Sequence, residues 1–154
     1  MYKKILVPLD GSEFSECILE HVRAVATGCQ VPEVVLLRVI EPWDRQIYEV
    51  PEDWRRDIEK KAQAEIEDHL SKLADNLRQE GIAVSTAVVE GKPVDEILNY
   101  TSKNQVDLIA MSTHGRSGVS RFAFGSVADR VIRYSAIPLL IASPAGCRIG
   151  GSSR

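Results

Sequence analysis

Residues 106–126, VDLIAMSTHGRSGVSRFAFGS, join a short apolar run to a polar loop that contains three glycines. The apolar run, VDLIAM, has the length and aliphatic composition of a strand that is buried on both faces. A helical pattern begins at the end of the loop, near Ser126. A buried strand, a loop and a helix in this order are the unit from which parallel α/β sheets are built.

The rest of the chain repeats this alternation. Apolar runs typical of strands lie at 4–9, 33–40, 83–91, 106–111 and 138–143. Helical spacing and cap residues predict helices at 12–28, at 52–80, from Pro93 onward and at 127–134. Because strands separated by helices form parallel sheets with right-handed crossovers, we predict a single-domain α/β fold: an open five-stranded parallel sheet with helices on both faces.

The longest predicted helix, 52–80, has one apolar face, which we expect to be its buried side. This face is formed by Ile58, Ala62, Ile66, His69, Leu70, Leu73 and Leu77. The segment before it, 43–54, shows neither helical nor strand periodicity and is the longest connector.

The composition limits the class of protein. The chain has 154 residues, 44% of them apolar and 27% charged, and a formal net charge of −3. Neither nucleic acid nor a membrane is therefore expected as a partner, because neither would be drawn to such a surface. No apolar run approaches the roughly 20 residues that span a bilayer, and the first residues lack the features of a signal peptide. The three cysteines are odd in number and lack CxxC spacing, so we expect them to be reduced and the protein to be cytoplasmic.

Two loops with small polar residues follow predicted strands, at 8–12 (PLDGS) and at 112–126. In an open parallel sheet, ligands bind outside the carboxyl ends of the strands, where the strand order reverses. If the first and fourth strands are neighbours at that point, the two loops face each other across one crevice. Asp10 is then either a turn residue or an acceptor for ribose hydroxyls or for a phosphate-bound divalent cation.

The second loop has the chemistry of a phosphate site. Gly115 allows backbone amides to approach an anion closely, and Gly125 and Ser126 lie where the positive end of a helix begins. Ser126 and Asp129 also fit a capping box, which would give Ser126 a structural role instead. The segment 112–135 carries four arginines against one acid, and these arginines either bind phosphate or are solvated.

Several enzymatic signatures are missing from the sequence. It contains no G-x-G-x-x-G motif, no Walker A loop around Gly91, no nucleophile elbow around Ser117 and no cluster with metal-ligand spacing. His114 has no evident partner carboxylate, so we expect it to orient or pack rather than to act as a general base. The sequence therefore predicts a phosphate cradle without an evident nucleophile or base.

With these features the chain resembles the universal stress protein family, in its nucleotide-binding subgroup. The resemblance runs from KKILVPLDGSEFS through VVLLRVI to SAIPLLIAS, which is nearly the whole chain. We therefore assign residues 1–143 to one universal stress protein domain and 144–154 to a flexible C-terminal tail. The resemblance implies a Rossmann-like fold of the adenine nucleotide alpha hydrolase-like type, with strand order 3-2-1-4-5.

The ATP-binding motif of this family is G-x2-G-x9-G-[ST]. Gly115, nine further residues and then Gly125 and Ser126 match it in spacing and in position after the fourth strand. Ser112 stands where the motif has its first glycine. Since serine is small and can donate a hydrogen bond of its own, we expect binding to survive this departure.

The resemblance implies a stress-response regulatory protein that binds ATP or AMP, with Mg²⁺ or Mn²⁺ accompanying the nucleotide. Pro8, Leu9 and Asp10 would line the adenosine site, with Asp10 meeting the ribose or the metal, and the backbone of Val39 would contact the adenine edge. The residues implied to hold the ribose and the phosphates are Met111, Ser112, His114, Gly115, Arg116, Gly125, Ser126 and Val127.

Members of this family usually dimerise through the last strand, which implies a homodimer through residues 138–143, and they act as regulators rather than as efficient catalysts. Two alternatives remain open: a slow ATP hydrolase, and a dimerisation module that binds no nucleotide. The intact spacing from Gly115 to Ser126 argues against the second. The aromatic segment 43–54, which would lie near the adenine edge, is either a lid or an ordinary surface loop.

Overall fold

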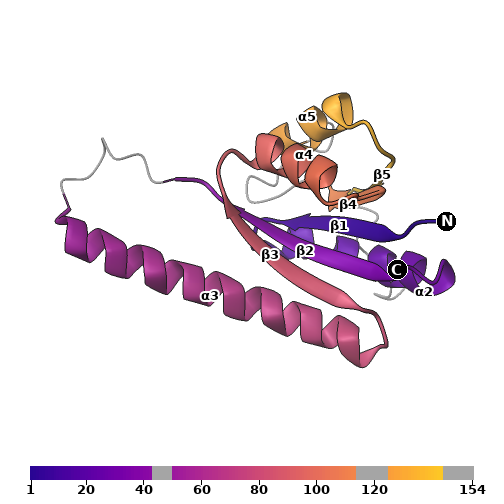
Figure 1. The fold of residues 1–154 in the computed structure, drawn as a ribbon, viewed down its shortest axis with the longest axis horizontal. Coiled ribbons are helices and arrows are strands. Elements are labelled where there is room, and N and C mark those ends of the chain that lie inside the picture. Colours follow the sequence, from indigo (N-terminus) through magenta and orange to yellow (C-terminus); the bar gives the residue numbers. More distant parts are fainter. Residues whose placement is uncertain (43–49, 114–124, 144–154) are drawn as a thin grey trace, which may run out of the picture.

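The computed structural model of the protein describes residues 1–42, 50–113 and 125–143. Its centre is one parallel sheet of five strands in the order β3-β2-β1-β4-β5 (Figure 1). The strands are β1 (Lys4–Leu9), β2 (Glu33–Ile40), β3 (Val84–Glu90), β4 (Leu108–Ser112) and β5 (Leu139–Ala142). The predicted fold class and strand order are confirmed, and the strand order reverses between β1 and β4.

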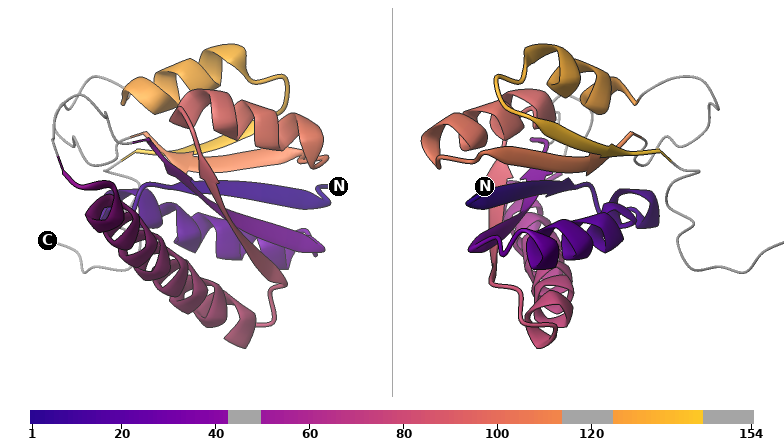
Figure 2. Two further views of the ribbon diagram at one scale, coloured as in Figure 1. Left: turned by 60° about the vertical axis from the view of Figure 1, so that its left-hand side comes forward. Right: turned by 90° about the vertical axis from the view of Figure 1, so that its right-hand side faces the viewer.

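Helices cover both faces of the sheet (Figure 2). One face carries α2 and α3, and the other carries α4 and α5. The helices are α1 (Glu13–Glu16), α2 (Ile18–Gly28), α3 (Glu52–Gln79), α4 (Pro93–Lys103) and α5 (Ser126–Tyr134). Each crossover between parallel strands thus brings an amphipathic helix onto the sheet, as the alternating pattern predicted.

The two faces account for the continuous apolar runs of the central strands. In β2, Val34 and Leu36 pack under α2 and α3, whereas Val35 and Leu37 pack under α4 and α5. Successive side chains of a strand point to opposite faces, so a strand covered on both sides needs an apolar residue at almost every position. The same alternation continues past Leu37 and places Arg38 on the α2–α3 face.

The long helix α3 differs from the expectation that its whole apolar face is buried. Only its second half packs on the sheet, through Leu70, Ala74 and Leu77, while Trp54 and Ile58 are 68% and 42% exposed. The reason is length: 28 residues of helix span about 42 Å, whereas the seven residues of β3 span only about 23 Å. The first half of α3 therefore projects beyond the carboxyl ends of the strands (Figure 1).

The predicted helix 12–28 is divided into α1 and α2 at Cys17. Ser12 is the N-cap of α1, and its side chain accepts a hydrogen bond from the backbone N–H of Ser15. Cys17 is disulfide-bonded, so the expectation that all three cysteines are reduced is wrong for this residue; Cys29 is a free, half-buried thiol.

Within the described ranges, no helix is both long enough and apolar enough to cross a membrane.

Candidate functional site

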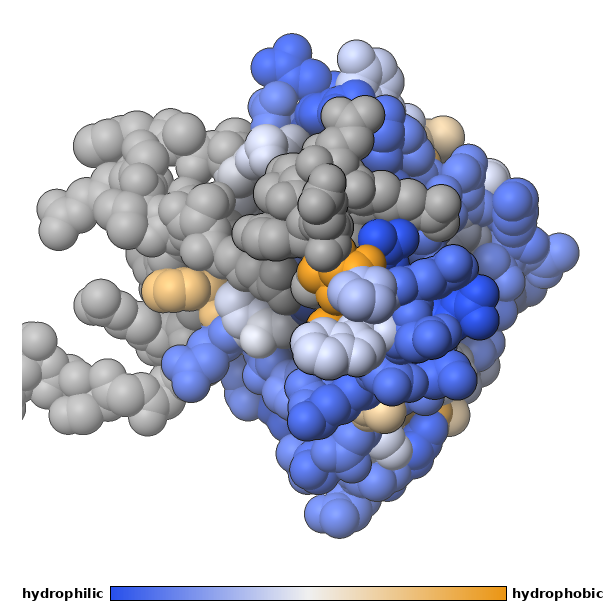
Figure 3. Space-filling view, turned by 90° about the vertical axis from the view of Figure 1, so that its left-hand side faces the viewer, coloured by the Kyte–Doolittle hydropathy of each residue, from blue (hydrophilic) through white to orange (hydrophobic). Residues whose placement is uncertain are grey.

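A cavity of about 470 Å³ opens at the carboxyl ends of β1, β2 and β4, beside the point where the strand order reverses. This is the size of a small-molecule site and the place where open parallel sheets bind ligands. On this side of the molecule, apolar surface gathers between hydrophilic side chains (Figure 3). The sequence-predicted site residues that line the cavity are Pro8, Leu9, Asp10, Val39, Met111, Ser112, Gly125, Ser126 and Val127.

Three of the predicted site residues, His114, Gly115 and Arg116, lie outside the described residues. The same holds for most of the proposed lid segment, because the structure does not describe residues 43–49. The described part of the site therefore comprises the ends of the strands and the start of α5.

The end of β1 presents Asp10 in a tight turn. The Oδ1 atom of Asp10 accepts hydrogen bonds from the backbone N–H of Ser12 at 2.9 Å and from the Ser12 hydroxyl at 2.6 Å. The backbone N–H of Asp10 donates to the Ser15 hydroxyl at 3.2 Å. Asp10 is thus a turn residue, which was one of the two predicted roles. It also lines the cavity, as the second predicted role, an acceptor for ribose or for a phosphate-bound cation, requires.

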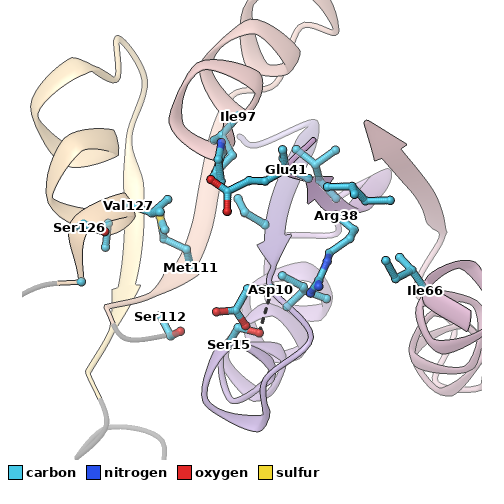
Figure 4. Close-up of a pocket in the computed structure, with 18 of the residues that line it drawn as sticks. Asp10, Ser15, Arg38, Glu41, Ile66, Ile97, Met111, Ser112, Ser126 and Val127 are labelled. Carbon is cyan, nitrogen blue, oxygen red and sulfur yellow. Dashed lines mark hydrogen bonds between the residues drawn. The ribbon is translucent and has the colours of Figure 1, made fainter. Parts of the chain in front are cut away.

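The end of β4 and the start of α5 form the opposite wall (Figure 4). Ser112 and Thr113 are buried, and the backbone N–H of Gly125 donates a hydrogen bond to the carbonyl of Thr113. Gly125 is the N-cap of α5, and Ser126 is its first helical residue. The capping-box interpretation of Ser126 is therefore wrong, because the cap position belongs to Gly125, which has no side chain. The exposed Ser126 hydroxyl instead lies at the mouth of the cavity.

The walls between these polar ends are apolar. Val39 of β2, Met111 of β4, Val127 of α5 and Ile97 of α4 line the cavity. A flat heteroaromatic ring suits such walls, and the polar groups at both ends suit a sugar and an anion. The arrangement can therefore hold a ligand with an apolar ring at one end and an anionic group at the other.

Two further charged residues, Arg38 and Glu41, line the cavity. Neither was predicted from the sequence. Arg38 is 8% exposed, and its guanidinium approaches Gly11. The available signal was its position, since it interrupts the apolar run of β2. Ala62 and Ile66, near the middle of α3, also line the cavity, because this part of the helix passes beside the strand ends.

No group of three or more His, Cys, Asp or Glu side chains with metal-binding geometry is found in residues 1–42, 50–113 and 125–143. Asp10 contributes a single carboxylate, one oxygen of which already accepts two hydrogen bonds from Ser12. A divalent ion at this place would take most of its oxygen ligands from phosphates and water, as Mg²⁺ commonly does.

The chain is similar to known proteins over most of its length. The model of the universal stress protein family matches residues 1–143. Universal stress protein MJ0577 of Methanocaldococcus jannaschii is 32% identical over 154 residues, with 92% of this chain and 94% of that protein covered. A solved structure of MJ0577 has a TM-score of 0.80 at 35% identity and covers 93% of this chain and 96% of that chain.

Two more distant solved structures share the fold. A universal stress protein in complex with cAMP has a TM-score of 0.68 at 21% identity, with 92% of this chain and 97% of that chain covered. The Arabidopsis thaliana protein At3g01520, solved with AMP bound, has a TM-score of 0.65 at 18% identity and covers 92% and 91% of the two chains.

Proposed function

The chain belongs to the universal stress protein family. We propose that it is a regulatory protein of the stress response that binds an adenine nucleotide, ATP or AMP. The nucleotide occupies the cavity at the carboxyl ends of β1, β2 and β4. The observation that carries the proposal is that described residues from the ends of both predicted loops line the same cavity. Asp10, after β1, and Ser126, at the start of α5, line one cavity of suitable size at the reversal of strand order.

The adenine occupies the apolar part of the cavity, between Met111 and Val127 on one side and Val39 on the other. The backbone of Val39, near the end of β2, contacts the edge of the base. Asp10 accepts hydrogen bonds from ribose hydroxyls, as a carboxylate fixed in a turn is suited to do. Two relatives of the same fold were solved with adenine nucleotides bound, which supports this choice of ligand.

The phosphates lie on the segment between Ser112 and Ser126. The N-terminus of α5 supplies backbone amides and the positive end of the helix dipole, and Ser126 supplies a hydroxyl donor. Gly115 and Arg116, which the motif assigns to the same role, complete the phosphate site. Three or four charge-assisted hydrogen bonds of roughly 1.5–3 kcal/mol each, offset by ordering costs, make micromolar affinity the expectation.

Mg²⁺ or Mn²⁺ accompanies the nucleotide in this proposal, and Asp10 is the one described side chain assigned to it. The ion would neutralise phosphate charge. The functional unit is a homodimer in which β5 of one copy pairs with β5 of the other, since an apolar edge strand favours pairing.

A slow ATP hydrolase is the second candidate, and a turnover assay separates it from a binding protein. Hydrolysis requires an oriented water and a base within hydrogen-bond reach, and Asp10 is already assigned to the ribose. We expect turnover with Mg²⁺ or Mn²⁺ far below the enzyme median of roughly 10 per second. A rate of that order that is lost in His114→Ala or Asp10→Asn would favour the hydrolase.

The experiment that identifies the ligand is mass spectrometry of small molecules released when the purified protein is denatured. We expect ATP or AMP in near-stoichiometric amount from protein purified without added nucleotide. Release of no nucleotide, together with no binding of added ATP, would favour the nucleotide-free dimerisation module.

A further inference from the structure

We infer that Arg38 is a positioning residue that sets the selectivity of the site for ribose over deoxyribose, by holding the turn that presents Asp10. The inference rests on the proposed function, because it assumes that Asp10 accepts hydrogen bonds from the ribose. It adds to that proposal a residue to which neither the family motif nor the sequence pattern gives a role.

The position of Arg38 is fixed by the sheet. Arg38 pairs in register with Leu9, the last residue of β1, and its side chain lies on the face that carries α2 and α3. The side chain is buried, with 8% exposure, and it lines the cavity. In Figure 4 it extends from β2 toward Asp10, on the side away from Ser112 and Ser126. Arg38 therefore faces the turn after β1 rather than the proposed phosphate site.

The guanidinium and the turn fit closely at Gly11. A Cβ atom added to Gly11 would lie 2.6 Å from Nη1 of Arg38 and 3.3 Å from its Cζ. Gly11 also has φ +84°, a conformation that residues with a side chain adopt at a cost. Glycine thus permits both the turn and the approach of the arginine, so the planar guanidinium packs directly on the backbone of the turn.

The turn transmits this contact to Asp10. The Oδ1 atom of Asp10 accepts hydrogen bonds from the N–H and the hydroxyl of Ser12, the residue after Gly11. The backbone N–H of Asp10 donates a hydrogen bond to the hydroxyl of Ser15. These bonds keep the turn in one piece, so a shift of Gly11 moves the Asp10 carboxylate. Removing the guanidinium leaves an unfilled space next to Gly11, so the turn can move toward the position of the lost guanidinium.

A carboxylate accepts a hydrogen bond from a ribose hydroxyl only at suitable distance and angle. When the carboxylate is held in place, a deoxynucleotide loses that bond and leaves a charged acceptor unsatisfied, at a cost of about tenfold or more in affinity. When the turn can move, the ribonucleotide loses the same advantage. The signature of a positioning role is therefore a change in the ratio of affinities, not a uniform loss.

The test is calorimetric titration of ATP, 2′-deoxy-ATP and 3′-deoxy-ATP into the full chain. The deoxynucleotide that lacks the hydroxyl bound by Asp10 should bind more weakly than the other. We expect the wild type to bind ATP about tenfold or more tightly than this weaker deoxynucleotide. Arg38→Met keeps a long side chain without the guanidinium. In this variant we expect ATP to weaken by about that factor, with little change for the weaker deoxynucleotide, so that the ratio approaches one.

Gly11→Ala tests the same contact from the other side, and Gly81→Ala is its matched control. Gly81 also has φ +84°, but a Cβ there would meet no atom within 4 Å. Both variants should lose thermal stability, since both place a side chain at positive φ, and Gly11→Ala should lose more because its Cβ must also displace the Arg38 guanidinium. Only Gly11→Ala should lower the ribose preference, and it carries the test alone if Arg38→Met does not fold.

Two results would overturn the inference. In the first, the wild type binds all three nucleotides equally. In the second, the variants keep the wild-type ratio of affinities, and a loss by the same factor for all three nucleotides would then indicate a role in the fold or in phosphate binding. Failure of the proposed function is distinct from these, because the wild type then binds none of the three nucleotides.

Discussion

The backbone N–H of Gly125 donates a hydrogen bond to the carbonyl oxygen of Thr113, with 2.6 Å between nitrogen and oxygen. Twelve positions separate the two residues in the chain, yet this bond joins the residue that follows β4 to the cap of α5. Ser112 and Ser126, at the two ends of the glycine loop, consequently line the same cavity. The proposed phosphate site thus has its two ends held together by backbone.

Ser126→Ala should weaken ATP more than adenosine, because the lost hydroxyl serves the phosphates and not the base. Ser126 is the first residue of α5 and not its cap, so the free energy of unfolding should change by no more than about 0.5 kcal/mol. Calorimetric titration of both ligands and denaturant unfolding measure these effects. A stability loss of about 1 kcal/mol with unchanged ATP affinity would instead indicate a capping role.

Asp10→Ala and Asp10→Asn should separate the two roles of this residue. The alanine variant removes the acceptor for both hydrogen bonds from Ser12 and should lose about 1–2 kcal/mol of stability. The asparagine variant keeps an oxygen for Ser12 and should retain most of the stability. Both should bind ATP about tenfold more weakly. Unchanged ATP affinity in the asparagine variant would indicate that Asp10 stabilises the turn and does not bind the nucleotide.

Glu33 should make the stability depend on pH in the acid range. Its pKa is lowered, chiefly by the hydrogen bond with Lys4 and further by the Ser85 hydroxyl, against the effect of burial. A lowered pKa in the folded state stabilises the protein at neutral pH, and this contribution is lost as the pH falls below the ordinary glutamate range and through the lowered pKa. Both side chains of the ion pair are partly exposed, so the contribution stays below about 1 kcal/mol.

Unfolding of Glu33→Gln between neutral and acid pH measures this contribution. The variant should be less stable than the wild type at neutral pH, and the difference should shrink as the pH falls. Glu65→Gln, at an exposed position on α3, is the control and should follow the wild type throughout. A difference that stays constant with pH would contradict the assignment.

The edge of β5 should mediate a homodimer, seen by light scattering at micromolar concentration as a mass about twice 17.1 kDa. The carbonyls of Pro138 and Ala142 accept bonds from β4, so the backbone N–H groups of Leu139 and Ile141 point to the open edge. Ile141→Pro removes one of these outward donors without removing a bond to β4. It should give a folded monomer, whereas Ile141→Val should remain a dimer. A monomeric wild type would contradict the prediction.

Most of the fold could be predicted from the sequence because the central strands are covered on both faces. A run such as VVLLRVI has few other stable environments, and the intervening helices require parallel strands. The extent of α3 packing could not be predicted in this way. The apolar spacing of α3 continues to Ile58, but the neighbouring β3 is too short to cover it. A helical pattern records which side is apolar, not how long the partner element is.

The lining of the cavity could be predicted where the expected chemistry restricts the residue type and the spacing, as at Asp10, Gly125 and Ser126. Arg38 could not be found by that route, since a charged residue late in a strand is usually solvated. Its significance depends on Gly11, which is distant in sequence and receives the guanidinium only because β1 and β2 are neighbours. Such contacts follow from the register of the sheet, which the sequence pattern leaves open.

The central claim is that the loop ending at Ser126 binds the phosphates of an adenine nucleotide. The most direct test is calorimetric titration of ATP into the wild type, into Gly115→Val at the motif position, and into Gly118→Val at a glycine that the motif does not require. We predict micromolar binding by the wild type and by Gly118→Val, and no measurable binding by Gly115→Val while its circular dichroism stays that of the folded protein. Equal affinity in all three proteins, or no binding by the wild type, would contradict the account.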